Sequence, residues 1–225
     1  KECDLPAEPT PDYLDWQMWL GPSPERPYNE LLSPNVSWDG YPAWRNYYDY
    51  GGGLMTDWGA HNFDIVQWAL GMDNAGPVEL IAPKDKGDKD APLTFVYENG
   101  MSMTRTNYRK SNGVLFVGTE GRIDINRWEY QTRPDHLLQI PIGPNEITLY
   151  ESNNHYADWL NAVKHRTDPI CDVEIGHRSA TVCNIGNICY RLGRDLKWDP
   201  KAERFIGDDE AVRNAHVETP ALVYD

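Results

Sequence analysis

The sequence lacks the features of a membrane-spanning or nucleic-acid-binding protein. It has no run of about 18 apolar residues, the length that a membrane-spanning helix needs. Basic residues are few, since 21 Lys and Arg stand against 35 Asp and Glu, and the formal net charge is -14. Binding to phosphates requires a basic face. We therefore expect neither a membrane nor a nucleic acid as a partner.

Cysteine is scarce, and its spacing matches no metal-binding pattern. The sequence has no CxxC pair, so a zinc site built from cysteines is not expected. Cys183 and Cys189 share a segment with a helical pattern, which places their Cα atoms ~9 Å apart, beyond the ~7 Å limit for a disulfide. The cysteines leave the compartment open between cytoplasm and periplasm.

A phosphate-binding fingerprint is also absent. Neither GxGxxG nor GxxxxGK followed by Ser or Thr occurs in the sequence. Gly51, Gly52 and Gly53 form a run, but no strand is predicted before them, so the run does not fit either fingerprint. We expect no dinucleotide-binding domain within residues 1–225.

The composition that remains is that of a soluble globular protein, with 40% hydrophobic and 25% charged residues. A chain of 225 residues can bury one good core or two small ones. Prolines are frequent in residues 1–50 and forbid long helices there. We expect a connector in this region, with one short helical piece over 14–20.

Hydrophobic periodicity organises the rest of the chain. Residues 51–71 predict a glycine turn and a helix over 54–70 that Gly71 ends. Residues 77–150 alternate with period two, which predicts an antiparallel sheet of about five or six strands. Its hairpins and last strand are expected at 93–108, around Asn99 and Gly100, at 113–126 and at 146–150.

Residues 151–225 return to a helical period and end in a charged tail beyond Trp198. Asn153 is a candidate cap for a helix whose apolar stripe is Tyr156, Leu160 and Val163. A second helix is expected over 176–192, closed by Gly193. The fold class that follows is α+β, with an open, mainly antiparallel sheet and helices packed on one face.

Chemistry is concentrated on the helix that follows the glycines. Asp57, His61 and Asp64 are spaced i, i+4 and i+7, so they share one helix face at the border of the apolar half. A carboxylate and an imidazole on one face form a candidate acid/base pair. Two other interpretations stay open: Asp57 supports the helix dipole while His61 borders the core, or the three residues bind a metal ion.

Three further residues are candidates for substrate binding. His177, Arg178 and Ser179 lie at the expected N-terminus of the second helix, where they would bind an anion or a sugar hydroxyl, or take part in capping. His155 has a similar status, and Arg45 is either a substrate clamp or a surface charge.

Four segments of the sequence resemble the C-terminal domain of the Gfo/Idh/MocA oxidoreductases. They are LDWQMWLGP at 14–22, YDYGGGLMTDWGAHNFDIVQWALG at 48–71, LFVGTEGRIDIN at 115–126 and GHRSATVCNIGNICYRLGRDLKWDP at 176–200. The resemblance implies a partner Rossmann domain that binds NAD or NADP and carries a catalytic lysine. It places the family's catalytic Asp and His at Asp57 and His61.

The function that the resemblance implies is dehydrogenation of a hydroxyl group on a sugar or polyol. We expect the cofactor to be bound mainly by a domain absent from this chain, so the chain alone is inactive. Substrate contacts are expected from Arg45, Tyr48, Trp58, Asp64, His155 and His177. We also expect a homo-oligomer that forms through the sheet. The alternatives are a carbohydrate-binding or assembly module without catalysis, an NAD-dependent glycosidase, and a metal-dependent hydrolase.

Overall fold

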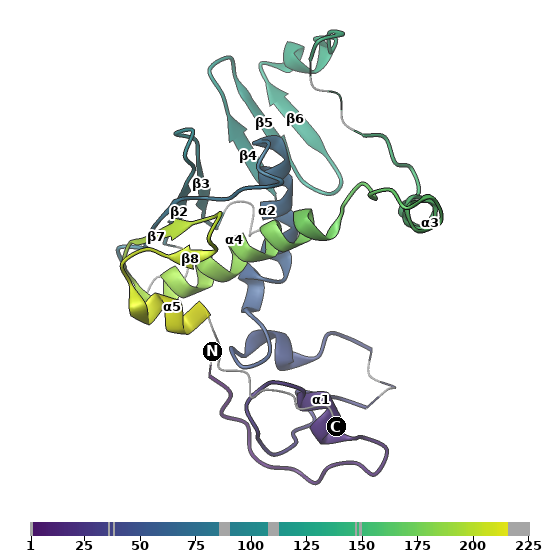
Figure 1. Ribbon diagram of the computed structural model, residues 1–225, viewed down its shortest axis with the longest axis vertical. Coiled ribbons are helices and arrows are strands. Elements are labelled where there is room, and N and C mark those ends of the chain that lie inside the picture. The colour runs from purple at the N-terminus through teal and green to yellow at the C-terminus, as the bar shows by residue number, and fades with distance from the viewer. Residues whose placement is uncertain are drawn as a thin grey trace.

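The computed structural model describes residues 2–35, 37, 39–85, 91–107, 113–146, 148 and 150–215. The N-terminal part forms one lobe, and the helices and sheets that follow form a larger body (Figure 1). The fold class is α+β, as predicted. No helix in the described part of the chain is long and apolar enough to cross a membrane.

Residues 2–50 fold around a small core of their own. The short helix α1 (Trp16–Leu20) begins at Asp15, whose carboxylate accepts a hydrogen bond from the backbone N–H of Met18 at 2.9 Å. The Trp16 ring stacks on Trp19 at 4.5 Å. Five side chains of this core are buried: Trp16, Leu20, Tyr28, Leu32 and Tyr47. The expected helical piece is present, and the aromatic residues around it form a core that the proline content did not indicate.

The predicted helix over 54–70 is divided in two. A 3-10 turn, η2 (Gly53–Met55), precedes the helix α2 (Trp58–Ala69). Gly53 has φ +65°, a conformation that glycine adopts without strain. The uninterrupted periodicity predicted Asp57 inside the first turn of the helix. The structure places Asp57 at the N-cap of α2 instead.

The strands form two sheets, so the prediction of one sheet drawn from residues 77–150 was wrong. The larger sheet has the order β3-β2-β1-β7-β8 and the smaller one has the order β4-β5-β6, and all pairings are antiparallel. The strands of the larger sheet are β1 (Glu79–Ile81), β2 (Leu93–Val96), β3 (Ser102–Arg105), β7 (Leu196–Asp199) and β8 (Arg204–Phe205). Those of the smaller sheet are β4 (Val114–Val117), β5 (Arg122–Ile125) and β6 (Tyr130–Arg133).

Both predicted hairpins are confirmed, and two strands arise where a tail was expected. Val96 pairs with Ser102 across the first hairpin and Val117 with Arg122 across the second. Strands β7 and β8 come from the segment after the helices, and β7 pairs with β1. A strand at 146–150 is not observed: residues 146, 148 and 150 are irregular, and residues 147 and 149 lie outside the described residues.

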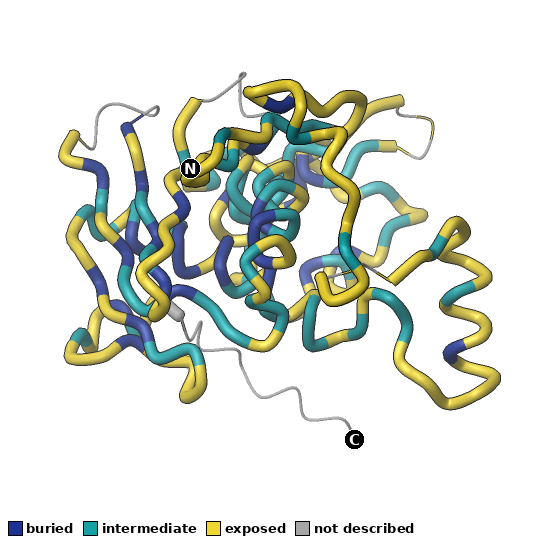
Figure 2. Tube along the Cα trace, turned by 90° about the horizontal axis from the view of Figure 1, so that it is seen from above, coloured by how far each residue is buried: buried dark blue, intermediate teal, exposed yellow. Residues whose placement is uncertain are grey.

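Three helices complete the body: α3 (His155–His165), α4 (Val173–Leu192) and α5 (Asp209–Ala215). Helix α4 begins at Val173, three residues before the predicted start, and ends at Gly193 as predicted. Helix α3 is capped by Asn154 and not by Asn153. Figure 2 shows the buried residues gathered around the sheet and the central helices, with α3 exposed at one end.

The main core lies between α4, α2 and the larger sheet. Gly186 on α4 faces Phe95 on β2 so closely that a Cβ at this glycine would lie 2.7 Å from the phenyl Cζ. Phe63 on α2 meets the same ring edge-to-face at 5.5 Å. Gln67 is 1% exposed; its amide donates to the carbonyls of Met72 and Ala75, and its oxygen accepts from the Tyr97 hydroxyl at 2.7 Å. This packing fixes α2 relative to α4.

Candidate active site at the start of helix α2

Asp57 and Arg45 form the best-defined polar contact at the candidate site. The Arg45 guanidinium donates two hydrogen bonds to the Asp57 carboxylate, from Nε at 2.9 Å and from Nη2 at 2.5 Å. Both side chains are about three-quarters buried, with exposures of 27% and 28%. Donation of these hydrogen bonds to Asp57 raises the pKa of Arg45 above its usual value, so the guanidinium stays charged. A bidentate pair fixes the orientation of both groups.

His61 lies one turn further along α2, beside an aromatic side chain. Its imidazole meets Trp58 edge-to-face with ring centroids 5.7 Å apart. The Arg127 guanidinium, from the turn between β5 and β6, lies 5.0 Å from the centroid of the Trp58 ring. His61 is exposed to solvent and Trp58 is 40% exposed. The imidazole is therefore accessible to a substrate, next to an aromatic face and a cation.

The expected link between Asp57 and His61 does not take the form of a hydrogen bond among the described residues. Both oxygens of Asp57 are engaged by Arg45. The structure instead pairs Asp57 with Arg45 and His61 with Trp58. Asp57, Trp58 and His61 all lie at the start of α2, and Arg45 comes from η1. The spacing of residues 57, 61 and 64 gave no sign of Arg45 as the partner of Asp57.

Asp64, the third member of the predicted face, makes a contact between two helices. Its Oδ1 accepts a hydrogen bond from the Ser179 hydroxyl of α4 at 2.7 Å. With Asp57 held by Arg45 and Asp64 by Ser179, the three residues do not converge on one point. Within the part of the chain that the structure describes, no group of three or more His, Cys, Asp or Glu residues is placed to hold a metal ion.

The glycine run is a close-packing device. A Cβ at Gly52 would lie 2.2 Å from the methyl group of Thr56 and 2.4 Å from Nδ2 of Asn187, and a Cβ at Gly51 would lie 3.0 Å from the carbonyl oxygen of Arg45. Asn187 Nδ2 also donates to the Gly52 carbonyl at 2.9 Å. These glycines therefore bring the start of α2 against α4 and against Arg45.

The same residues do not fit a dinucleotide. The run follows a 3-10 helix, η1 (Ala43–Asn46), and a turn, whereas a pyrophosphate site needs a strand that leads through glycines into a helix. The space that a phosphate would require above Gly52 holds Thr56 and Asn187.

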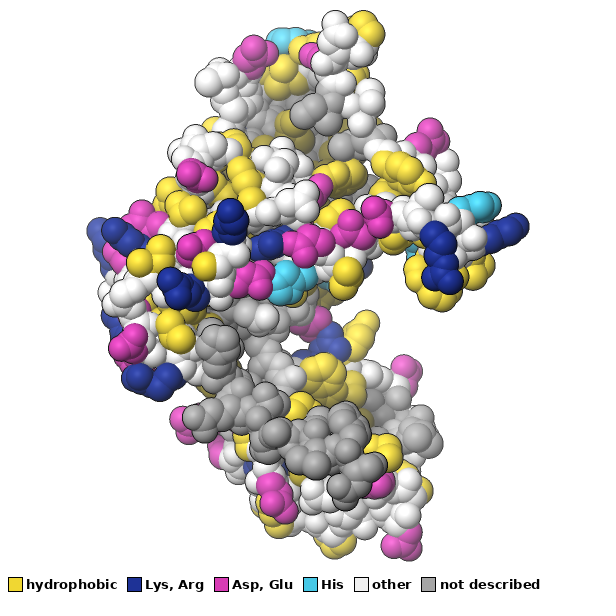
Figure 3. All heavy atoms as spheres, in the orientation of Figure 1, with side chains coloured by type: hydrophobic (Ala, Val, Ile, Leu, Met, Phe, Trp, Pro, Cys, Tyr) yellow, Lys and Arg dark blue, Asp and Glu magenta, His cyan; other side chains and the backbone are white. Residues whose placement is uncertain are grey.

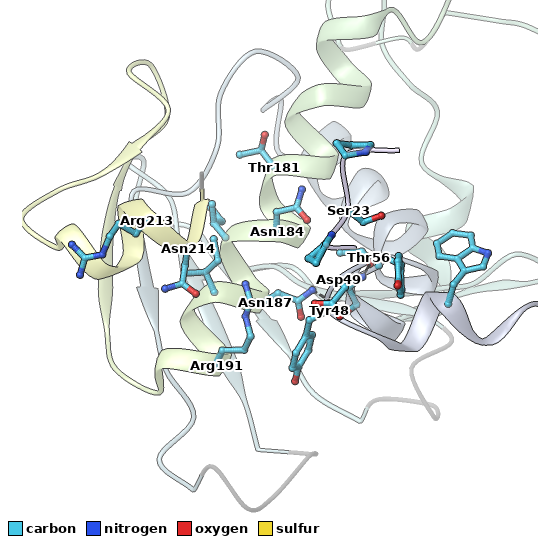
Figure 4. A pocket seen from close by; sticks show the side chains of 18 of the residues that line it. Ser23, Tyr48, Asp49, Thr56, Thr181, Asn184, Asn187, Arg191, Arg213 and Asn214 are labelled. Carbon is cyan, nitrogen blue, oxygen red and sulfur yellow. Dashed lines mark hydrogen bonds between the residues drawn. The ribbon is translucent and has the colours of Figure 1, made fainter. Parts of the chain in front are cut away.

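A cleft of about 1340 Å³ opens beside the glycines, between α4 and the N-terminal lobe. Figure 4 shows Thr181, Asn184, Asn187 and Arg191 along α4, on the side that faces the N-terminal segment. Tyr48 lies at one end, where the Arg191 guanidinium is 5.1 Å from its ring centroid. The predicted substrate residue Tyr48 thus lines a cavity.

The other two predicted histidines lie away from α2. His155 is exposed on α3 and its ring contacts Tyr156 at 4.1 Å. His177 lies inside the second turn of α4 and not at its N-terminus, and its Nε2 is 2.5 Å from Glu203 Oε1. Arg178 binds Glu203, Glu174 and the Pro200 carbonyl. This network ties the β7–β8 turn to α4, which accounts for the polar start of the segment.

Comparison with known families identifies the class of protein. The chain matches the family model described as the oxidoreductase family, C-terminal alpha/beta domain, over residues 1–221. It therefore belongs to the Gfo/Idh/MocA oxidoreductase family, in which NAD(P) is generally bound through the N-terminal domain. A comparison with curated protein sequences gives no match. Family membership supports a general oxidoreductase role.

Three residues that were not predicted as site residues also lie in this region: Arg127, Asn187 and Arg191. A helical wheel of residues 173–192 could have found the last two, because they continue the polar stripe of Thr181 and Asn184 at spacings of three and four. Arg127 lies in a hairpin turn of the smaller sheet, and its approach to Trp58 depends on how that sheet packs, which no local pattern encodes.

Proposed function

We propose that this chain supplies the substrate-binding and proton-transfer half of an NAD(P)-dependent dehydrogenase that acts on a hydroxyl group of a sugar or polyol. Membership of an oxidoreductase family supports the class of reaction. The observation that carries the assignment to α2 is the accessible imidazole of His61 beside the fixed Asp57–Arg45 pair. The cofactor would be held by an N-terminal domain, since the residues here do not form a pyrophosphate site.

His61 is the residue that we assign to proton transfer. Oxidation of a carbinol carbon requires a group that accepts the hydroxyl proton, while the nicotinamide, when bound, accepts the hydride. A neutral imidazole has a free ring nitrogen for that proton. Trp58 holds the ring edge-to-face and offers an apolar surface on which the carbon face of a sugar can pack.

Asp57 and Arg45 act as a positioning unit in this proposal. The bidentate contact keeps the Asp57 carboxylate fixed at the N-cap of α2, one turn from His61. The guanidinium neutralises that carboxylate, so the site does not repel a substrate oxygen that gains negative charge as its proton leaves. Removing either residue leaves the other as a partly buried, unpaired charge.

A double-mutant cycle in the polypeptide that carries both domains tests this assignment. NAD and NADP reduction would be followed with a panel of aldoses, inositols and alditols, for the parent, Arg45→Met, Asp57→Asn and the double variant. Both single variants should lose turnover, and the double variant should lose no more than either one, because the pair acts as a unit. Absence of cofactor reduction with every substrate, or additive losses, would contradict the proposal.

Self-association through the smaller sheet is the second part of the proposal. The outer face of the larger sheet is polar, with the hydroxyls of Thr94 and Thr104 3.1 Å apart. On one face of the smaller sheet, Phe116 packs against the main core, whereas Ile123 and Tyr130 are 42% and 65% exposed. We expect a dimer or larger assembly that covers this face, and an Ile123→Asp variant that sediments as a 25.8 kDa monomer. A monomeric parent chain would refute it.

A further inference from the structure

The cleft between α4 and the N-terminal lobe has a built polar wall. Thr181, Asn184, Asn187 and Arg191 follow one another at helical spacing along one side of α4, opposite the face that packs on the sheet. Asn184 is exposed, and among the described residues its amide has no hydrogen-bond partner. The stripe spans about 15 Å of helix axis. A wall of amides, a hydroxyl and a guanidinium offers repeated hydrogen-bonding positions along a line.

The opposite side of the cleft is aromatic. Trp19, Trp44, Tyr48 and Tyr50 from the N-terminal lobe line it. Aromatic rings facing amide and guanidinium groups suit the carbon faces and the hydroxyl edges of sugar rings respectively. Figure 4 shows Tyr48 and Arg191 together at one end of this arrangement.

The charges around the cleft balance. The charged residues that line it are Asp49, Arg191, Glu203 and Arg213, two of each sign. Figure 3 likewise shows acidic and basic side chains mixed across the visible face of the molecule. An anionic ligand such as a sugar phosphate would need an excess of positive charge, so the lining favours a neutral ligand.

The size of the cleft favours more than one sugar ring. Its volume of about 1340 Å³ exceeds the ~300–1,000 Å³ of ordinary small-molecule pockets. We propose that this cleft binds a neutral oligosaccharide of two or more rings. The proposal rests on the proposed function, because Gly52 and Thr56 at the cleft lead directly into Asp57 and would bring one end of the oligosaccharide to α2.

Calorimetric titration of the chain tests the inference without turnover. The probes are glucose, galactose, cellobiose, lactose, maltose, cellotetraose, maltotetraose and glucose 6-phosphate. At least one oligosaccharide should bind tenfold or more tightly than its monosaccharide. Glucose 6-phosphate should bind no more tightly than glucose. Asn184→Leu and Arg191→Met should each weaken that binding tenfold or more. Asn161→Leu, on exposed α3, is the matched control and should leave it unchanged.

The outcomes separate this inference from the proposed function. No binding by any probe, equal binding of monosaccharide and oligosaccharide, or full binding by both cleft variants overturns the cleft assignment. Loss of binding in a variant counts in favour only if its thermal melt matches the parent. If oligosaccharides bind but the two-domain polypeptide reduces no cofactor, the cleft assignment holds and the dehydrogenase proposal fails. If a monosaccharide is oxidised and no oligosaccharide binds, the reverse is true.

Discussion

Helices α3 and α4 each carry apolar side chains at helical spacing, but their surroundings differ. Along α4, the apolar side chains Val182, Ile185 and Ile188 are at most 3% exposed and belong to the main core. Along α3, the predicted stripe is largely open, with Tyr156 at 71% and Val163 at 52% exposed, and Ala162 is the buried residue of the helix. The 3.6-residue period thus predicts that a helix forms and which side is apolar, but not what covers that side.

The largest expected effect separates two glycines of α4. Gly186→Ala places a methyl group 2.7 Å from Phe95 Cζ, so we expect a loss of about 2–3 kcal/mol in the free energy of unfolding. Gly176→Ala, on the same helix, meets nothing within 4 Å and should gain up to about 1 kcal/mol. Denaturant unfolding of both variants checks the pair. Equal effects at the two positions would mean that α4 does not pack on the sheet at Gly186.

A smaller loss of stability is expected when a buried hydrogen bond is removed, and a still smaller loss when an exposed one is removed. Tyr97→Phe removes the hydroxyl that donates a hydrogen bond to the Gln67 side-chain oxygen in the core. The amide oxygen left without this partner should lower the free energy of unfolding by about 1–2 kcal/mol. Tyr150→Phe removes a hydroxyl bound to Asp158 of α3 at the surface and should change stability by less than about 0.5 kcal/mol. Thermal melts of both variants give the difference, and similar losses would refute the contrast.

Because the apolar stripe of α3 is exposed, we expect that shortening its side chains changes the stability of the chain little. Trp159 is 59% exposed, so Trp159→Ala should cost under about 0.5 kcal/mol in this chain. A buried tryptophan would cost ~3–5 kcal/mol when replaced by alanine. Equilibrium unfolding distinguishes the two values, and a loss of 2 kcal/mol or more would show that α3 is covered in solution.

The reactivity of the cysteine thiols distinguishes buried from exposed positions without any substitution. Burial raises the pKa of Cys183 and of Cys189 to about 12, so only about 10⁻⁴ of each is thiolate at pH 8. Cys171, before α4, is exposed. In a thiol titration of the folded protein, Cys171 should react and the two α4 cysteines should not. On unfolding, all four cysteines should react. Rapid reaction of Cys183 in the folded chain would contradict the burial of α4.

The sequence predicted the elements whose signals are local. The Asn99–Gly100 hairpin, the Gly193 helix end and the separation of Cys183 from Cys189 follow from spacing and turn chemistry, and the structure agrees. The division into two sheets could not be predicted, because no local signal tells whether β4 pairs with β3. The pairing of β7 with β1 was equally hidden, since the two strands lie far apart along the chain. The Arg45–Asp57 contact was hidden because it joins the 3-10 helix η1 to the N-cap of α2 across the glycine turn, which no periodic pattern encodes.

The proton-transfer role of His61 is the central claim, and one pair of variants tests it most directly. In a polypeptide that joins this chain to a dinucleotide-binding domain of the family, His61→Asn keeps hydrogen bonding but cannot take the substrate proton, so NAD(P) reduction should fall by ~10²–10⁴-fold while the thermal melt is unchanged. His136→Asn, at an exposed position on the 3-10 turn after β6, should keep parental turnover. A His61→Asn enzyme with the melt and the turnover of the parent would contradict the account.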